Sequence, residues 1–597
     1  EARPWSPEGQ PRRAGVSSFG ISGTNAHIIL EEFPDTDTTG SSLPDMPALW
    51  PLSGSTDTAL RAGAGRLLEH LTEHPGLAAA EVGHSLAVGR TAFSKRAVVL
   101  PGTREEQLES LAALATGGPA PRVVRGTAAE RLTTAYLFTG QGSQWAGMGH
   151  DLYSSHTVFA HSLDEICEAF DEVLPRRLQK VLFAEPGSPE AELLDRTEYA
   201  QPALFAVETA LFRLLGELMP EPDWVAGHSL GGLTAAHASG VLSLADACAL
   251  VAARGRLMQA QPSDGAMVAC EASEEEMTEA VSHYPGLVDV AAVNGPSATV
   301  VSGDAAAVAE VVRTFSERGR RVKALRVSHA FHSPDMGGAL VPYRKVVSAL
   351  AFHPPRIPIV SEVTGVPLTI AELRDPDHWV RQLRSTVRFG DVISTLRSAN
   401  VAAFVEVGPD ALLAPMIASC LPSSWPVVVP TLVRGQAAGS ALSAALARLH
   451  CAGGPINWDA WYGRPAGPRA ELPTYPFERQ HYWWPVGTIA TTGAAGSPIP
   501  AALDQSDATT PSRPEVDAGD SLLDLVRIHA AHVLGHPSPD AIAAEEHFLD
   551  IGFSSFTALE VRNRLCESTG LELPPSLLFD YPTPISVAEF LEQQSVA

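Results

Sequence analysis

A serine between two glycines is the residue of this chain best placed to act as a nucleophile. Residues 227–231 read Gly-His-Ser-Leu-Gly, between a short apolar run, Trp224–Ala226, and an alanine-rich stretch that begins at Leu233. This order predicts a strand, a tight turn and a helix, with the Ser229 hydroxyl exposed on the turn. The N–H groups at the start of that helix could hold an oxyanion. Esterases, lipases and thioesterases share the pattern, so the motif alone leaves the acyl substrate open.

Two residues further along the chain could complete this chemistry. His332, within Ser-His-Ala-Phe-His-Ser-Pro (328–334), follows a predicted strand and could serve as the base for Ser229. A solvated loop histidine is the alternative interpretation. Arg254 lies in an apolar helical run, where its planar guanidinium could bind a carboxylate through two parallel hydrogen bonds. A surface ion pair is the alternative for Arg254.

Composition places the chain among soluble multidomain proteins. It has 597 residues, 45% of them hydrophobic, and no apolar run of 18 residues that would span a membrane. Because the chain starts at Glu1 without a signal peptide, we expect it to be part of a longer cytoplasmic protein. The net charge of −26 argues against nucleic acid as a partner. The cysteines have neither paired nor metal-like spacing, so neither disulfides nor a metal site are expected: Cys167, Cys248, Cys270, Cys420, Cys451 and Cys566.

The chain divides by composition into a series of segments around one large α/β domain. Within that domain, residues 266–328 show a strand–helix–strand–strand–helix–strand order, which predicts a ferredoxin-like subdomain that forms one wall of a cleft. The predicted segments are 1–32 (glycine turns and a strand), 33–130 (a small α/β unit), 131–432 (the large α/β domain), 433–485 (an aromatic-rich tail), 486–520 (a flexible linker rich in Pro, Gly, Ser and Ala) and 521–597 (a compact helical domain).

Six motifs in fixed order carry a family resemblance. Together they resemble the acyltransferase domain of a modular type I polyketide synthase, a relative of malonyl-CoA:acyl carrier protein transacylases. The resemblance implies an α/β-hydrolase-like core for the large domain. The motifs are Phe-Thr-Gly-Gln-Gly-Ser-Gln (138–144), Tyr-Ala-Gln-Pro-Ala-Leu-Phe (199–205), Gly-His-Ser-Leu-Gly (227–231), Arg-Gly-Arg-Leu-Met-Gln (254–259), His-Ala-Phe-His (329–332) and Val-Glu-Val-Gly-Pro (405–409).

The resemblance implies a role for each matched residue. Ser229 would be the nucleophile and His332 its general base, with a backbone carbonyl in place of the usual aspartate. Arg254 would bind the free carboxylate of malonyl-CoA. The backbone N–H groups of Gln141 and Leu230 would form the oxyanion hole. Gln201 and Asn294 match polar positions that line the site in the family.

The motif before the base implies the choice of acyl group. In the family, His-Ala-Phe-His marks malonyl domains, and His329 and Phe331 would lie against the substrate. Phe331 would fill the space of an α-methyl group, and one methyl changes binding by about 1–3 kcal/mol, so the resemblance favours malonyl over methylmalonyl. We call the predicted turn at Gly-His-Ser-Leu-Gly (227–231) the elbow. The sequence departs from the family directly after it, because Gly232 stands where the family usually has glutamate.

A second serine lies near the other end of the chain. Ser555 precedes an amphipathic stretch, Phe556–Leu565, and an N-cap is its ordinary interpretation. The segment 521–597 resembles an acyl carrier protein, in which this serine would carry 4′-phosphopantetheine added by a phosphopantetheinyl transferase. The phosphodiester would favour a helix N-terminus. Ser554 replaces the usual aspartate, and the register set by Glu560 selects Ser555 over Ser554.

The flanking segments extend the resemblance. Gly23–His27 is similar to the last strand of a ketosynthase, so residues 1–32 would be a ketosynthase remnant and 33–130 the ketosynthase–acyltransferase linker. Residues 433–485 are similar to the post-acyltransferase linker. The implied partners are a homodimeric upstream ketosynthase and the chain's own or a neighbouring carrier domain. Only about 35 residues lie between linker and carrier, so we expect an extension module without reductive domains.

Three alternatives remain open at this point. A decarboxylating loading module contains the same domains, and the residue that would distinguish it lies in the ketosynthase. An α/β serine hydrolase would need an acidic third member and no carboxylate clamp. A degenerate scaffold is suggested by Gly232 and Ser554.

Overall fold

The computed structural model describes residues 11–20, 23–32, 47–422, 427–463, 469–479, 521–553 and 555–595. The chain divides into two compact units. One contains the described residues between Asp37 and His481, and the other contains those before Thr36 and after Tyr482. Among the described residues, no helix combines the length and the apolar character needed to cross a bilayer. The predicted linker 486–520 lies outside the described residues.

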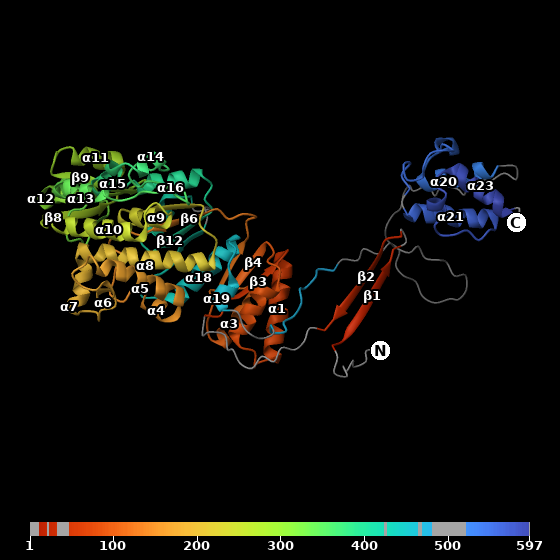
Figure 1. The fold of residues 1–597 in the computed structure, drawn as a ribbon, viewed down its shortest axis with the longest axis horizontal. Coiled ribbons are helices and arrows are strands. Elements are labelled where there is room, and N and C mark those ends of the chain that lie inside the picture. The colour runs from red at the N-terminus through yellow and green to blue at the C-terminus, as the bar shows by residue number, and fades with distance from the viewer. Residues whose placement is uncertain are drawn as a thin grey trace. The chain divides into compact units, whose positions relative to one another are not determined.

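A parallel four-stranded sheet forms the centre of the large subdomain. Its strand order is β13-β12-β6-β7, and every residue of β6 (Thr134–Phe138) and β12 (Ala403–Val407) is buried. Strands covered on both faces need apolar side chains on both, which explains these continuous apolar runs. β7 (Trp224–Gly227) lies at one edge and β13 (Val427–Pro430) at the other. Helices pack around this sheet (Figure 1).

Three helices after or beside β7 position the candidate nucleophile. α9 (Leu230–Ala238) starts directly after Ser229, and α8 (Thr197–Leu218) and α10 (Leu244–Gln259) pack beside it. The other helices of this subdomain are α4 (His150–Ser155), α5 (Thr157–Asp171), α6 (Leu178–Leu182), α7 (Pro189–Glu192), η1 (Leu193–Asp195), η2 (Pro334–Met336), α13 (Gly337–Val347), α14 (Ile370–Leu373), α15 (Pro376–Arg384), α16 (Phe389–Ser398) and α17 (Leu413–Cys420).

The small subdomain has the element order expected from the sequence. It runs β8 (Gly265–Cys270), α11 (Glu274–Val281), β9 (Val288–Gly295), β10 (Ala298–Asp304), α12 (Ala305–Glu317) and β11 (Val322–Ala324). Its strands form an antiparallel sheet in the order β11-β8-β10-β9. The last strand ends at Ala324, because only Val322, Lys323 and Ala324 pair with β8.

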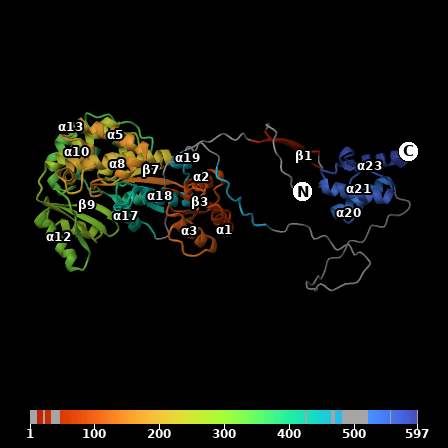
Figure 2. The same ribbon diagram turned by 90° about the horizontal axis from the view of Figure 1, so that it is seen from below.

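A small α/β domain precedes the large subdomain in the same unit. Its antiparallel sheet has the order β3-β4-β5, from β3 (Trp50–Gly54), β4 (Lys95–Val99) and β5 (Val123–Thr127). Figure 2 shows this domain and the small subdomain at opposite ends of the unit, with the parallel sheet between them. Its helices are α1 (Asp57–Glu73), α2 (Ala79–Gly89) and α3 (Arg104–Thr116). Two helices that follow the large subdomain in the sequence, α18 (Ala438–Ala452) and α19 (Trp458–Tyr462), also pack against this domain.

The segment 469–479 returns along the small α/β domain. Its Tyr475 hydroxyl pairs with the Ser55 hydroxyl at 2.8 Å, and Arg90 donates to the carbonyls of Leu472 and Pro473. We call this segment the strap. The strap follows the large subdomain in the sequence, and its contacts are with the small α/β domain, which precedes the large subdomain.

The second unit contains a hairpin and a helical domain. The hairpin pairs β1 (Arg13–Phe19) with β2 (Asn25–Glu31) in antiparallel register. The helical domain has its own core, which includes Val526, Val561 and Leu591. Its elements are α20 (Leu522–Leu534), η3 (Pro539–Ala541), α21 (Ser555–Thr569), α22 (Leu577–Asp580) and α23 (Pro584–Ser595).

Candidate active site

The turn between β7 and α9 holds Ser229 in a strained conformation. Its backbone has φ 54° and ψ −105°, a region that residues with a side chain rarely occupy. Gly227 permits this sharp turn, since a Cβ there would overlap the backbone of Gly231. The strand, turn and helix predicted from the sequence are all present, and the strain fixes where the Ser229 hydroxyl points.

The Ser229 hydroxyl lies between a base and a cation. Its Oγ is 2.7 Å from Nε2 of His332, and Nη2 of Arg254 donates to the same Oγ at 3.0 Å. On the other side of the imidazole, Nδ1 of His332 lies 2.9 Å from the carbonyl oxygen of Ser385. A carbonyl only accepts, so Nδ1 carries the proton and Nε2 is free to accept the proton of Ser229.

His332 is kept neutral by its surroundings. It is 4% exposed, and burial lowers its pKa to about 3, with further lowering by the nearby Arg254 and His228. The hydrogen bond to Ser385 opposes this shift but does not cancel it. A neutral imidazole is the form that can act as a general base.

Arg254 is a buried cation, and not a member of a surface ion pair. It projects from α10, is 1% exposed, and burial lowers its pKa, although a guanidinium stays charged in proteins. Its Nε has no hydrogen-bond partner among the described residues. A buried cation with an unused donor is suited to an anionic ligand that accepts from two of its nitrogens.

A cavity of about 600 Å³ opens at these side chains, between the large and small subdomains. This volume is typical of sites for small molecules. Seven of the residues predicted from the sequence line it: Gln141, Gln201, Ser229, Arg254, Asn294, Phe331 and His332.

Two predicted site residues lie outside the cavity lining. Leu230 is fully buried as the first residue of α9, where its N–H has no partner within the helix, so its predicted backbone role needs no exposed side chain. His329 is 2% exposed and pairs through Nδ1 with the Ser328 hydroxyl at 2.9 Å. The structure therefore places His329 behind the lining, where it packs beside Phe331.

Polar residues of the cavity lining bond to one another. Asn294, at the end of β9, accepts from Nε2 of His228 at 2.9 Å, and burial lowers the pKa of His228. Gln201 on α8 donates to the Gln141 side chain at 3.4 Å. These bonds connect the small subdomain, α8 and the loop after β6 to the residues around Ser229.

The sequence did not indicate four residues that support the site. Ser385 contributes only a backbone carbonyl, which no side-chain pattern can reveal. Gln382 donates to the carbonyl of Ser229 and, at 2.9 Å, to Glu362. The signal for Glu362 is a lone acidic residue after the apolar run 357–360. His228, within the elbow motif itself, lines the cavity.

A buried carboxyl group joins the two predicted oxyanion-hole segments. Glu208 on α8 accepts from Thr234 of α9 at 2.8 Å and from Thr139, two residues before Gln141, at 2.5 Å. Burial raises the pKa of Glu208 to about 8. Glu208 connects the loop after β6 to the elbow helix.

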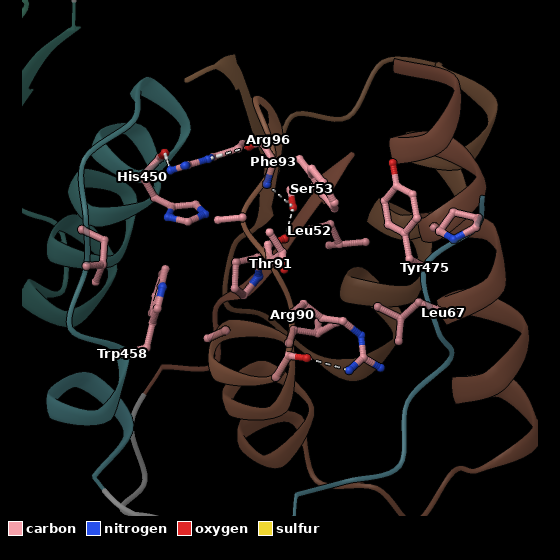
Figure 3. A pocket seen from close by; sticks show the side chains of 18 of the residues that line it. Leu52, Ser53, Leu67, Arg90, Thr91, Phe93, Arg96, His450, Trp458 and Tyr475 are labelled. Atoms are coloured by element: carbon pink, nitrogen blue, oxygen red, sulfur yellow. Dashed lines mark hydrogen bonds between the residues drawn. The ribbon is translucent and has the colours of Figure 1, made fainter. Parts of the chain in front are cut away.

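A second cavity, of about 580 Å³, lies between the small α/β domain, α18 and the strap (Figure 3). The polar groups around it bond to one another: Ser53 donates to Thr91, and Arg96 to the carbonyl of His450. No nucleophile paired with a base lines it among the described residues. Ser229 and His332 line the other cavity.

Ser555 is the first residue of α21, a helix of 15 residues. The side chains of Ser555 and Phe556, and all of Ser554, lie outside the described residues. The unpaired N–H groups at the start of such a helix suit a phosphodiester, so this position fits a phosphopantetheine group.

Family models match three parts of the chain. "Acyl transferase domain" matches residues 135–455, "Ketoacyl-synthetase C-terminal extension" matches residues 1–100, and "Phosphopantetheine attachment site" matches residues 524–591. The first model covers more than half of the chain and includes every residue around the cavity at Ser229.

Two similar proteins are polyketide synthase proteins that are several times longer than this chain. The chain is 47% identical over 506 residues to the spectinabilin polyketide synthase system protein NorB of Streptomyces orinoci, covering 83% of the chain and 23% of NorB. It is 42% identical over 618 residues to the polyketide synthase GfsA of Streptomyces halstedii, covering 99% of the chain and 8% of GfsA. The chain therefore spans less than a quarter of the length of either relative.

A solved acyltransferase domain has the same fold. The domain from the second module of the salinomycin polyketide synthase is 44% identical, with a TM-score of 0.60, and the match covers 72% of this chain and 99% of that one. A ketosynthase extension, an acyltransferase domain and a phosphopantetheine attachment domain thus follow one another in one chain. The chain belongs to the modular type I polyketide synthases.

Proposed function

We propose that this chain transfers a malonyl group from malonyl-CoA, through an ester on Ser229, to a carrier thiol attached at Ser555. The observation that carries the proposal is the position of the Ser229 Oγ, 2.7 Å from a neutral imidazole and 3.0 Å from a buried guanidinium. The imidazole makes the hydroxyl a nucleophile, and the guanidinium suits the second carboxylate of malonyl-CoA.

The first step forms the acyl-enzyme. Ser229 Oγ attacks the thioester carbonyl while Nε2 of His332 takes the hydroxyl proton. The backbone N–H groups of Gln141 and Leu230 stabilise the oxyanion. The carbon–sulfur bond then breaks, and His332 returns the proton to the departing sulfur of coenzyme A. Arg254 changes its partner from Ser229 Oγ to the malonyl carboxylate, which keeps the acyl group in place.

The second step runs the same chemistry in reverse. Phosphopantetheine, when bound at Ser555, supplies the thiol that accepts the acyl group. His332 takes the proton of the incoming thiol, the Gln141 and Leu230 N–H groups again hold the oxyanion, and the Ser229 Oγ leaves with the proton from His332. Because coenzyme A leaves before the carrier thiol reacts with the acyl-enzyme, the reaction is of the ping-pong type.

Phe331 supports malonyl over methylmalonyl as the acyl group. Its ring is 6% exposed and lines the cavity that contains Ser229 and Arg254. An α-methyl group would compete with this ring for space. His329, packed behind the ring, supports the ring position and does not itself touch the acyl group.

The fold supports an assignment of the segments. The strand order β11-β8-β10-β9, with a helix after β8 and another after β10, supports our assignment of a ferredoxin-like subdomain. We assign 33–130 as the ketosynthase–acyltransferase linker, 131–432 as the acyltransferase with an α/β-hydrolase-like core, 433–485 as the post-acyltransferase linker and 521–597 as a helical-bundle carrier. Together they would serve a non-reducing extension module, with an upstream ketosynthase and a phosphopantetheinyl transferase as partners.

Radiolabelled malonyl-CoA and methylmalonyl-CoA test the proposal directly. We expect label on the peptide that contains Ser229 with malonyl-CoA, little with methylmalonyl-CoA, and none in a Ser229→Ala variant. Label released as free malonate faster than it reaches the carrier would favour a hydrolase. An unlabelled Ser229 would rule out the enzymatic function and leave the scaffold alternative.

A further inference from the structure

A buried glutamate outside the cavity lining packs against the elbow helix. Glu362 is 5% exposed, and the run before it pairs with β7 through a bridge between Val225 and Ile359. A Cβ built on Gly232 would overlap Oε1 of Glu362. The carboxylate therefore occupies the space that any side chain at 232 would need, which gives a physical reason for glycine at this position.

Gln382 connects this carboxylate to the nucleophile. Its Nε2 donates to Oε1 of Glu362 at 2.9 Å and also to the backbone carbonyl of Ser229. Both partners are acceptors, so the NH₂ group of the amide must face them, whereas a flipped amide would place its oxygen against two oxygens. Glu362 thereby fixes which end of the Gln382 amide meets Ser229.

The same helix end holds both members of the Ser229–His332 pair. Gln382 lies in the last turn of α15 and bonds to the Ser229 backbone, while the carbonyl of Ser385, three residues on, accepts from His332. A small shift of this helix end would change the distance from Ser229 Oγ to His332 Nε2. Burial raises the pKa of Glu362 to about 7, and in either protonation state the carboxyl keeps an acceptor for Gln382.

We propose that Glu362 and Gln382 are positioning residues for the nucleophile: Glu362 orients the Gln382 amide, and this amide holds the Ser229 backbone so that its Oγ stays between His332 and Arg254. Gly232 is the complementary part of this arrangement, because it admits the carboxylate. The role in acyl transfer rests on the proposed function, but the geometry of the nucleophile can be measured without malonyl-CoA.

A fluorophosphonate measures that geometry. Ser229 Oγ forms a bond to phosphorus, fluoride leaves, and the hydroxyl proton passes to His332. We expect Glu362→Ala and Gln382→Ala each to lower the second-order labelling rate by about tenfold to a hundredfold, as small misplacements of reacting groups do. Glu362→Gln offers an acceptor to Gln382 and should recover most of the rate. The Glu362→Ala/Gln382→Ala double variant should be no slower than either single variant, because both act in one chain of contacts.

A glycine substitution tests the same contact from the other side. Gly232→Ala should slow labelling in the wild-type background through overlap with Glu362, and cost little in the Glu362→Ala background, where the methyl group has room. Glu317→Ala on the exposed face of α12 is the matched control and should leave the rate unchanged.

Two measurements separate the possible outcomes. The melting temperature of each variant is measured beside its rate, and variants that lose thermal stability but label at the wild-type rate would overturn the positioning role. Additive effects of Glu362→Ala and Gln382→Ala would overturn it as well, as would a wild-type protein that does not react at Ser229. If the wild type reacts with the fluorophosphonate but not with malonyl-CoA, the proposed function fails, and the positioning role is still decided by the labelling rates.

Discussion

The imidazole of His332 is oriented by the backbone carbonyl of Ser385, 2.9 Å from its Nδ1. A carbonyl fixes the tautomer of the ring as a carboxylate would, but it brings no negative charge that would stabilise an imidazolium. The imidazole of His332 is therefore held in one orientation and remains neutral. Several measurable properties depend on this arrangement.

The acylation rate should not fall as pH drops through the usual range of histidine. Because burial and Arg254 lower the pKa of His332 to about 3, its neutral form persists well below pH 6.5. We expect the single-turnover acylation rate of Ser229 to stay level from about pH 8 to about pH 5. An inflection near pH 6.5 that disappears in a His332 variant would contradict this expectation.

The same shift destabilises the fold in acid. The unfolded chain binds a proton at His332 near pH 6.5 and the folded chain does not, so the contribution of this residue to stability is complete above pH 6.5 and falls as pH decreases toward 3. Circular dichroism at each pH, recorded with the kinetics, identifies where loss of rate reflects unfolding.

Replacing Arg254 should change the acyl substrate. Charge-assisted hydrogen bonds contribute about 1.5–3 kcal/mol each, so loss of two in Arg254→Ala should lower kcat/KM for malonyl-CoA by about a hundredfold to ten-thousandfold. Acetyl-CoA, which has no second carboxylate, should lose little or gain. Arg254→Lys keeps the charge without the paired donors and should lie between the two. An equal loss with both substrates would show that Arg254 acts only through Ser229.

Replacing Phe331 by a smaller residue should relax the size limit. Phe331→Ser opens space next to Arg254 and Ser229 in the cavity. A methyl group is worth about 1–3 kcal/mol, so the ratio of kcat/KM for methylmalonyl-CoA to that for malonyl-CoA should rise by about tenfold to two-hundredfold. Competition between the two substrates in one reaction measures this ratio. An unchanged ratio would mean that another part of the cavity sets the selectivity.

The carrier serine can be identified by mass. We expect Ser555→Ala to abolish the mass increase produced by a phosphopantetheinyl transferase and coenzyme A, because we propose Ser555, the first residue of α21, as the acceptor. Ser554→Ala, the adjacent control, should retain the modification. Modification of the Ser555→Ala protein on Ser554 would show that the register is shifted by one residue.

The sequence predicts the elements around Ser229 because their patterns are local. The elbow needs glycines at fixed positions, and α9 begins directly after Ser229, as the predicted order of strand, turn and helix requires. Ser229, His332 and Arg254 are brought together as expected. The spacing of these three residues along the chain does not show that they meet in space. The order of the family motifs predicts that they do.

The supporting residues could not be predicted for a different reason. Ser385 acts through its backbone, and Gln382 and Glu362 act through contacts between segments that no pattern relates. In the sequence, Gly232 is seen only as a departure from the glutamate that the family usually has at this position. Its meaning depends on Glu362, which lies 130 residues away and needs the fold to reach it. Burial likewise placed His329 behind Phe331, which a motif cannot show.

The strap has a consequence for protein engineering. Through Tyr475 and Arg90, the chain that leaves the large subdomain is fastened to the domain through which the chain enters it. Entry and exit of the catalytic unit are thus side by side on one surface. Moving residues 47–479 together from one synthase to another keeps the strap with the small α/β domain that it contacts. If the transplanted segment ended before the strap, the small α/β domain would have to pack against the strap of the recipient synthase.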